Sequence, residues 1–397
     1  MFNKDMYELG SKRSSIRELF EYGKTRAAKV GKDNVFDFSL GNPNVPAPDC
    51  VKEAILSLAN DCDSTALHGY TSAQGDSSVR EAIANNICRR FGTKISKDNI
   101  YMTCGAAASL CITLRALNEG NDEFVVLAPY FPEYMVFIKT AGGKSVVVPY
   151  TEKDFTPDLS AFEKAISKNT KAVIINSPNN PCGVVYSQKT IEKIADILNK
   201  KSVEFGHPIF IIADEPYREL AYEVEVPYIM NFYNDTIVCY SYSKSLSLPG
   251  ERIGYIAISP NANNANNLYL SVCGAGRALG YVCAPSTYQQ VVKKCIDALP
   301  DIDAYRKNRD LLFDSLTKTG YDCVRPDGAF YLFVKSLEED ANAFADKAKQ
   351  LGLLLVPGDD FGAKGYVRIA YCVSHDMIKR SLPAFEKLFE QYESNKR

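Results

Sequence analysis

The feature that most constrains the fold is a series of short, continuous apolar runs separated by segments with helical periodicity. These runs cover residues 146–148, 172–175, 209–213, 237–240 and 253–257. Helical patterns, such as residues 191–200, lie between several of them. A strand that is apolar on both faces needs cover on both sides, which is typical of a parallel sheet between helices. The sequence therefore predicts an α/β fold with a mainly parallel sheet wrapped by helices.

Several of these runs end on polar residues of ligand-binding types. The second run leads into Asn176 and Asn180, the third into Asp214 and Tyr217, and the fourth into the loop of Lys244. Each exit alone is also typical of an ordinary turn. Because ligands of α/β sheets bind beyond the carboxyl ends of the strands, the three exits together predict one shared site.

The loop of Lys244 is rich in hydroxyl groups. Ser241, Ser243 and Ser245 surround the lysine, and Arg252 follows a few residues later. An amine in this setting can form an imine with an aldehyde whose phosphate is neutralised by the hydroxyls and the arginine. Pyridoxal phosphate is such an aldehyde.

The exit of the third run suits the same cofactor. A carboxylate such as Asp214 keeps a pyridine nitrogen protonated, so that the ring draws electrons. A phenol such as Tyr217 can hydrogen-bond the ring hydroxyl. The pattern of asparagine, aspartate, tyrosine, lysine and arginine therefore indicates pyridoxal phosphate chemistry.

With these motifs the chain resembles the fold-type I pyridoxal-phosphate enzymes, class I/II aminotransferases, closest to the aspartate aminotransferase branch. The resemblance extends from the turn at Gly41 to the apolar run around Arg368. It implies a seven-stranded, mainly parallel sheet in a large cofactor-binding domain of residues 46–285. Residues 1–45 and 286–397 are expected to form a smaller α+β domain, and 397 residues are enough for two cores.

The resemblance implies cofactor contacts for further residues. Gly105, Ala106 and Ala107 take the position of the family's phosphate cup, at a helix start where backbone N–H groups bind anions. Phe131 takes the position of the aromatic ring that stacks on the pyridine. Tyr70 takes that of a tyrosine reaching the cofactor phosphate of the other subunit, which implies a homodimer with shared active sites.

The resemblance also implies substrate contacts. Gly41 lies in the loop beside the substrate carboxylate, and Arg368 takes the position of the arginine that binds it, with Asn180 in support. A lone arginine in an apolar strand fits this role, because a buried charge needs a partner. Arg277 lies near the position of the arginine that aspartate enzymes receive from the neighbouring subunit, and it equally fits a surface arginine.

The implied reaction moves the amino group of an L-amino acid, aspartate first, to a 2-oxo acid such as 2-oxoglutarate by a ping-pong mechanism. An aminotransferase for aromatic or neutral amino acids is the alternative. A pyridoxal-phosphate-dependent carbon–sulfur lyase or an aminocyclopropane-carboxylate synthase-like enzyme would use nearly the same cofactor residues. A dinucleotide site at Gly274, Gly276 and Gly280 is not expected, because the spacing misses the G-x-G-x-x-G pattern by one.

Composition argues against other classes. A net charge of −2 with interspersed signs provides no basic stripe for nucleic acid. Three histidines and twelve cysteines without metal-ligand spacing favour free thiols and no metal site. No export signal and no apolar run long enough for a membrane span is found, so a cytoplasmic protein is expected.

Overall fold

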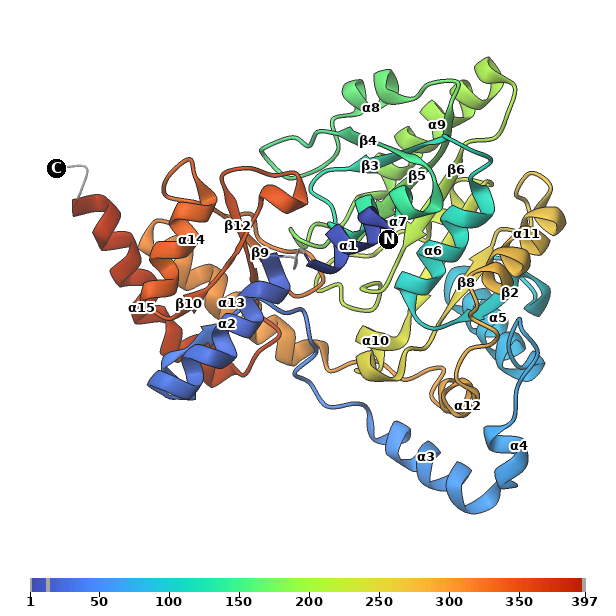
Figure 1. The fold of residues 1–397 in the computed structure, drawn as a ribbon, viewed down its shortest axis with the longest axis horizontal. Coiled ribbons are helices and arrows are strands. Elements are labelled where there is room, and N and C mark those ends of the chain that lie inside the picture. The colour runs from blue at the N-terminus through green and yellow to red at the C-terminus, as the bar shows by residue number, and fades with distance from the viewer. Residues whose placement is uncertain (1, 12–14, 395–397) are drawn as a thin grey trace.

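The computed structural model describes residues 2–11 and 15–394. Figure 1 shows a larger part built around the central sheet and a smaller part that combines the C-terminal helices with the N-terminal helix α2. The extended segment that follows α2 runs from the smaller part to α3 at the edge of the larger one.

The central sheet has seven strands in the order β2-β8-β7-β6-β5-β3-β4. The strands are β2 (Ile100–Thr103), β3 (Glu123–Leu127), β4 (Lys144–Val148), β5 (Thr170–Asn176), β6 (Phe210–Asp214), β7 (Thr236–Ser241) and β8 (Gly254–Ile258). All neighbouring pairs are parallel except the two made by β8. The predicted mainly parallel, seven-stranded sheet is confirmed.

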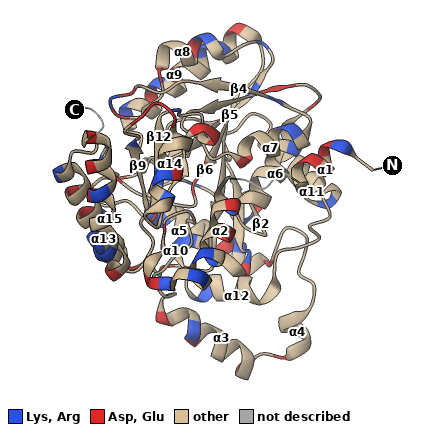
Figure 2. Ribbon diagram, turned by 60° about the vertical axis from the view of Figure 1, so that its left-hand side comes forward, with Lys and Arg blue, Asp and Glu red and all other residues tan. Residues whose placement is uncertain are grey.

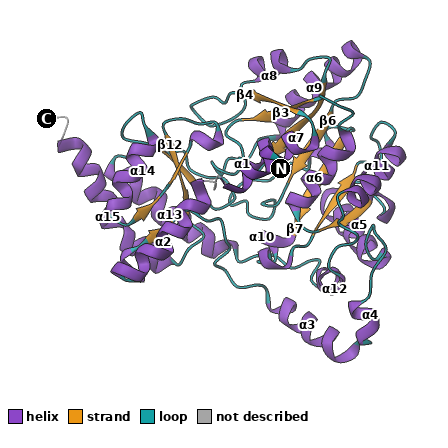
Figure 3. Ribbon diagram, in the orientation of Figure 1, coloured by secondary structure: helices purple, strands orange, loops and turns teal. Residues whose placement is uncertain are grey.

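Helices cover both faces of this sheet (Figure 3). The helices of this larger part are α3 (Asp49–Asp61), α4 (Ser64–His68), α5 (Ser77–Phe91), α6 (Ala106–Leu117), α7 (Glu133–Ala141), α8 (Leu159–Ala165), α9 (Gln188–Phe205), α10 (Tyr242–Ser245), α11 (Ala265–Ala278) and α12 (Ser286–Lys294). Alternate residues of β3 pack into different cores, Val125 and Leu127 into one and Phe124 and Val126 into the other. This two-sided burial explains why the strands are continuous apolar runs.

The smaller part has sheets of its own. Antiparallel strands pair in the order β11-β12-β9, and β1 pairs with β10 in parallel. The strands are β1 (Phe36–Asp37), β9 (Tyr331–Lys335), β10 (Leu353–Leu354), β11 (Val356–Pro357) and β12 (Tyr366–Ala370); the helices are α2 (Ser15–Val30), α13 (Ile302–Thr319), α14 (Ala341–Gln350) and α15 (His375–Ser394). The short helix α1 (Lys4–Ser11) has no buried residue.

The cores suggest where the two domains divide. Val291 and Val292 of α12 are buried in the same cluster as Val51 of α3 and Ile83 of α5, beneath the central sheet. We therefore propose that α12 belongs to the large domain, so that the division predicted at residues 285 and 286 lies between α12 and α13.

The surface and the cysteines are consistent with the composition. Figure 2 shows Lys and Arg interspersed with Asp and Glu along the helices of both parts. All twelve cysteines are free thiols. Within residues 2–11 and 15–394, no group of His, Cys, Asp or Glu side chains is arranged to hold a metal ion. No helix of these residues has the length and apolarity that a membrane crossing needs. Gly274 and Gly276 lie inside α11 and not at a strand-to-helix turn.

A glycine in β8 generates a prediction about stability. A Cβ added at Gly254 would collide with the carbonyl oxygen of Tyr240 and would lie 3.0 Å from the Cα atom of Gly105, and neither backbone atom can move aside easily. We expect Gly254→Ala to lower the free energy of unfolding by about 1–3 kcal/mol, measured by urea denaturation. Gly274→Ala is the matched control, because nothing lies within 4 Å of its added Cβ. It should leave stability unchanged or raise it, and equal losses in both variants would contradict the packing argument.

Candidate active site

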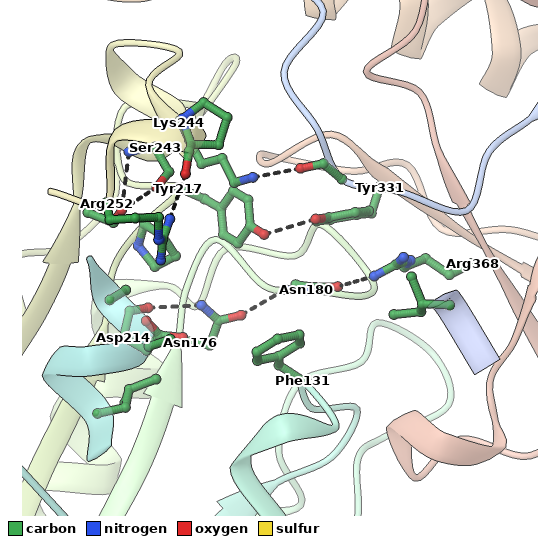
Figure 4. Close-up of a pocket in the computed structure, with 18 residues that line it drawn as sticks. Phe131, Asn176, Asn180, Asp214, Tyr217, Ser243, Lys244, Arg252, Tyr331 and Arg368 are labelled. Atoms are coloured by element: carbon green, nitrogen blue, oxygen red, sulfur yellow. Dashed lines mark hydrogen bonds between the residues drawn. The ribbon is translucent and has the colours of Figure 1, made fainter. Parts of the chain in front are cut away.

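A cavity of about 300 Å³ lies where the exits of β5, β6 and β7 face the start of α6 and the smaller part of the chain. Figure 4 shows Lys244 and Arg252 at one end, Arg368 at the other, and Asp214 with Asn176 on a third side. The lining residues are Ile16, Gly41, Ala106, Ala107, Leu110, Phe131, Asn176, Asn180, Asp214, Pro216, Tyr217, Ser241, Ser243, Lys244, Pro249, Arg252, Tyr331 and Arg368. The structure thus brings together residues that are distant in sequence.

Lys244 lies on the short helix α10, directly after β7. Its Nζ donates a hydrogen bond of 2.6 Å to the carbonyl oxygen of Gly41. Removal from water lowers the pKa of Lys244 to about 8, and the positive charges of Arg252 and Arg368 act in the same direction. A lysine amine with a lowered pKa is more often neutral near pH 7 and so more nucleophilic.

Asp214 ends β6 and is buried. Its Oδ2 accepts a hydrogen bond of 2.5 Å from the hydroxyl of Tyr134, whereas its buried Oδ1 has no partner. Burial raises the pKa of Asp214 to about 7, although the bond from Tyr134 lowers it. A cationic N–H group bound at Oδ1 would satisfy this oxygen and favour the ionised carboxylate.

Two asparagines at the end of β5 and in the turn after it form a rigid frame beside Asp214. Asn176 is aligned with Asp214 in the β5–β6 register, and its Nδ2 donates to the Asp214 carbonyl oxygen at 2.9 Å. Its Oδ1 accepts from the backbone N–H of Asn180 at 2.8 Å. The side chain of Asn180 is therefore presented to the cavity from a fixed backbone.

Another wall of the cavity combines the start of α6 with serine hydroxyls and Arg252. The first N–H groups of α6, around Ala106 and Ala107, have no carbonyl partner within the helix, and its Gly105 cap has φ 92°. A Cβ at Gly105 would lie 2.9 Å from Nη2 of Arg252, so only glycine lets the guanidinium approach the helix start. Free N–H groups next to a cation form an anion-binding site.

The serines of the Lys244 loop face different sides. The hydroxyls of Ser241 and Ser243 lie 2.7 Å apart and line the cavity. The prediction that Ser245 joins them is wrong: its hydroxyl lies 3.0 Å from that of Tyr240, and it lines a separate small cavity. Because the helix begins at Tyr242, residues two apart point about 200° away from each other.

Arg368 of β12 is a buried cation without a carboxylate partner among the described residues. Its Nη1 donates to Asn180 Oδ1 at 3.0 Å and its Nη2 donates to the carbonyl oxygen of Ser39 at 2.5 Å. Its Nε has no partner. The guanidinium lies over the ring of Tyr331, 4.7 Å from the centroid. An uncompensated buried guanidinium of this kind fits a ligand carboxylate.

Two aromatic groups complete the cavity. Phe131 precedes α7 and packs edge-on against Tyr134, with ring centroids 5.7 Å apart. Tyr217 is buried, and its hydroxyl lies 2.9 Å from that of Tyr331. The predicted positions of Phe131 and Tyr217 at one cavity are thus observed, and their contacts with a cofactor stay predictions.

Two predicted site residues lie outside the cavity of this chain. Tyr70 is 90% exposed, in the segment between α4 and α5. Arg277 is exposed on α11. Both roles require a second subunit, so they stay predictions.

The cavity fits pyridoxal phosphate. The unpaired Oδ1 of Asp214 matches a protonated pyridine nitrogen, and Phe131 offers a ring face. The start of α6 with Arg252 matches a phosphate, and Lys244 matches an aldehyde.

The sequence model of the family described as "Aminotransferase class I and II" matches residues 33–385. The chain belongs to this family. A solved amino transferase from Eubacterium rectale is 58% identical to it over 99% of each chain, with a TM-score of 0.97. The aspartate aminotransferase of Thermus thermophilus, solved with maleate, is 27% identical over 95% of this chain and 97% of that one, with a TM-score of 0.84. The aromatic-amino-acid aminotransferase 2 of Thermococcus litoralis is 27% identical over 95% of this chain and 96% of the relative.

Family membership establishes the class of reaction. Class I and II aminotransferases use pyridoxal 5′-phosphate, and this chain is a pyridoxal-phosphate-dependent transaminase near the aspartate aminotransferase branch. Its substrates are therefore an amino acid and a 2-oxo acid. The predicted family, fold and cofactor are confirmed.

Three polar residues at the site of this aminotransferase were not predicted: Asn176 and Tyr331, which line the cavity, and Tyr134, which donates to Asp214 from behind its wall. Tyr134 comes three residues after Phe131, at the start of α7, a spacing that could have indicated it. Asn176 is the last residue of β5, and its sequence context is typical of the turn that contains Asn180, so it gave no separate signal. Tyr331 stands in an apolar strand, where the sequence offers no signal that its hydroxyl meets Tyr217.

The titration of Asp214 generates a prediction for the cofactor-free protein. Between its ordinary pKa of 3.8 and the value of about 7 in the fold, the folded chain binds more protons than the unfolded chain. The contribution of Asp214 to stability therefore falls as the pH rises through this window. We expect the free energy of unfolding of the wild type, measured by urea denaturation, to fall relative to that of Asp214→Asn across the window. Tyr134→Phe should extend the fall to higher pH, and parallel pH profiles for wild type and Asp214→Asn would refute the assignment.

Proposed function

We propose that the chain transfers the amino group of L-aspartate to a 2-oxo acid such as 2-oxoglutarate, with the described cavity as its active site. The observation that carries the assignment of the cavity is the pairing of Lys244, whose pKa is lowered, with Arg368, a buried cation without a carboxylate partner in the described chain. An α-amino acid carries one amine and one α-carboxylate. The two residues enter from opposite sides of the cavity (Figure 4).

In this proposal the chain contacts the cofactor at four places: the phosphate, the pyridine nitrogen, the ring hydroxyl and the face of the ring. Arg252, the hydroxyls of Ser241 and Ser243, and the N–H groups at the start of α6 bind the phosphate. Asp214 Oδ1 binds the pyridine N–H, with Tyr134 fixing the carboxylate. Tyr217 and Asn180 hydrogen-bond the ring hydroxyl oxygen, and Phe131 packs on the ring.

When bound, pyridoxal phosphate supplies an electron sink that makes the Cα proton of the substrate acidic. Lys244 anchors the cofactor before substrate enters and moves the proton afterwards, since its pKa of about 8 is close to the working pH. Arg368 and Asn180 fix the substrate carboxylate beside Gly41, which orients the Cα–H bond toward Lys244. The same groups serve the amino donor and the 2-oxo acceptor, so ping-pong kinetics are expected.

The preference for aspartate rests on the aspartate branch and on Arg277. Thermus thermophilus aspartate aminotransferase was solved with maleate, a dicarboxylate. In this chain we assign the second carboxylate to Arg277 of a neighbouring subunit. Tyr70, 90% exposed here, would reach the cofactor phosphate of that subunit, which makes the homodimer part of the active site. Twelve free thiols suit the reducing cytoplasm.

An aromatic or neutral amino acid is the second candidate for the donor. It is favoured by the lining of the cavity, where Ile16 and Leu110 are apolar. The cations among the described lining residues are Lys244, Arg252 and Arg368, and all three already have roles. The name of the Thermococcus litoralis relative supports this candidate as well.

The first test of this function is the site of covalent attachment. We expect borohydride reduction of the cofactor-loaded protein, followed by peptide mass spectrometry, to label Lys244. Lys244→Ala should lose the label and reduce amino transfer to background. Lys347→Ala, at a lysine of α14 outside the cavity, should keep both. A label on another lysine would overturn the assignment.

The second test separates the two donor classes. Removing one partner from a desolvated pair of arginine and carboxylate costs about 2–5 kcal/mol of binding free energy. Arg277→Ala should therefore raise KM for aspartate about 30-fold or more. KM for phenylalanine or methionine should change less than about threefold, since these donors have no side-chain carboxylate. Arg380→Ala, at a surface arginine of α15, is the control. Equal losses for both classes, or a wild type that prefers neutral donors, would support the second candidate.

A further inference from the structure

Two buried tyrosines meet in the middle of the cavity. Tyr217 follows β6 of the central sheet, and Tyr331 begins β9 of the smaller part. Their hydroxyl oxygens lie 2.9 Å apart, although 114 residues separate them in the chain. In Figure 4 the contact between the two tyrosines lies between Lys244 on one side and Arg368 on the other.

The protons of the two phenols can be counted. Burial raises the pKa of Tyr331 to about 12 and that of Tyr217 well above its ordinary value, so both are protonated near pH 7. Their mutual hydrogen bond uses one proton and leaves one. If Tyr331 donates to Tyr217, the proton of Tyr217 is free to point into the cavity. The oxygen of Tyr331 also lies against Gly41, where an added Cβ would collide with it.

The ring of Tyr331 makes a second contact. The Arg368 guanidinium lies 4.7 Å from the Tyr331 centroid and 5.0 Å from that of Phe361. Its hydrogen bonds to Asn180 and Ser39 fix two of its nitrogens. The rings of Tyr331 and Phe361 therefore restrain the orientation of the guanidinium plane, which sets the direction from which a carboxylate can bind it.

The backbone holds Tyr331 in place from the segment that carries Tyr217. Ala329 adopts a φ of 56°, which is unusual for a residue with a Cβ. Its N–H donates to the carbonyl oxygen of Leu220 at 2.7 Å, and its own carbonyl oxygen accepts from the hydroxyl of Tyr222 at 2.5 Å. The two tyrosines are thus positioned by one hydrogen-bonded unit.

We propose that Tyr331 is a positioning residue of the reaction: its hydroxyl orients that of Tyr217 toward the cofactor ring, and its ring holds Arg368 in the plane that binds the substrate carboxylate. The proposal rests on the proposed function, because it takes the cofactor at Lys244 and the carboxylate at Arg368 as given. It connects the cofactor side of the cavity to the substrate side through one side chain.

Two substitutions separate the hydroxyl from the ring. Tyr331→Phe keeps the ring over Arg368 and removes the bond to Tyr217. The absorbance of the bound cofactor is recorded as the pH of the cofactor-loaded enzyme is raised. We expect the midpoint of its change to rise by about half to one pH unit, because the hydroxyl oxygen of the cofactor ring loses a donor, Tyr217, that is held in a fixed orientation. KM for the best amino donor should stay within about twofold, because the carboxylate site is intact. Tyr331→Leu removes both contacts and should also raise that KM by about 3- to 10-fold.

Tyr321→Phe is the matched control. Tyr321 is also a buried tyrosine of the smaller part, and its hydroxyl donates to the carbonyl oxygen of Phe385 at 2.9 Å, but it does not line the cavity. This variant should leave the absorbance midpoint and KM unchanged. Thermal unfolding of all variants shows whether a loss of fold accounts for any change.

The outcomes distinguish the inference from the function on which it rests. If the wild type carries no cofactor on Lys244, the proposed function fails and the inference fails with it. If the wild type carries it but Tyr331→Phe titrates like the wild type, only the inference is overturned. An equal shift in Tyr321→Phe also overturns it. If Tyr331→Leu raises KM no more than Tyr331→Phe does, the support of Arg368 by the ring is overturned.

Discussion

The parallel register of β5, β6 and β7 is the constraint on which the cavity depends. It aligns Asn176 with Asp214, and Asp214 with Cys239, two residues before Ser241. Because the three strands run in one direction, their polar exits appear at one edge of the sheet. A slip of one residue in β6 would turn Asp214 to the opposite face, into the apolar packing that covers the sheet. The same register that buries the core therefore sets the position of the carboxylate relative to the lysine.

Burial then determines how these groups titrate. Removal from water disfavours every charge, so it lowers the pKa of Lys244 and raises that of Asp214. Arg368 stays charged, because a guanidinium does not deprotonate in proteins. The chain alone thus leaves an unpaired oxygen on Asp214 and an unpaired nitrogen on Arg368. A ligand with a cationic ring nitrogen at one end and a carboxylate at the other would satisfy both.

The parts of the site that the sequence predicts are those with a local signal. Asp214 and Lys244 come shortly after apolar runs, and Arg368 lies within one. Each is therefore a charged residue at a position where the pattern predicts an apolar one or a strand exit. Tyr331 has no such signal, because a tyrosine in an apolar strand is typical of a core. Ser245 shows the opposite error: its spacing from Ser243 suggests one face, but the chain becomes helical at Tyr242 and turns it away. Contacts across the chain, such as that of Tyr331 with Tyr217, depend on how the two parts dock.

Substrate preference has the weakest local signal, for a physical reason. In the proposed function, every cation among the described lining residues is assigned to the cofactor or to the α-carboxylate that all amino acids share. The other lining residues include Ile16 and Leu110, whose apolar side chains do not bind a carboxylate. In this proposal the cation that recognises a second carboxylate is Arg277 of another subunit, so its position depends on the geometry of an interface and not on the cavity itself. Relatives at the same identity to this chain, 27%, carry the names of both aspartate and aromatic enzymes. The proposal accounts for both names, because a small change at such an interface would alter the preferred donor and leave the groups around Lys244 unchanged.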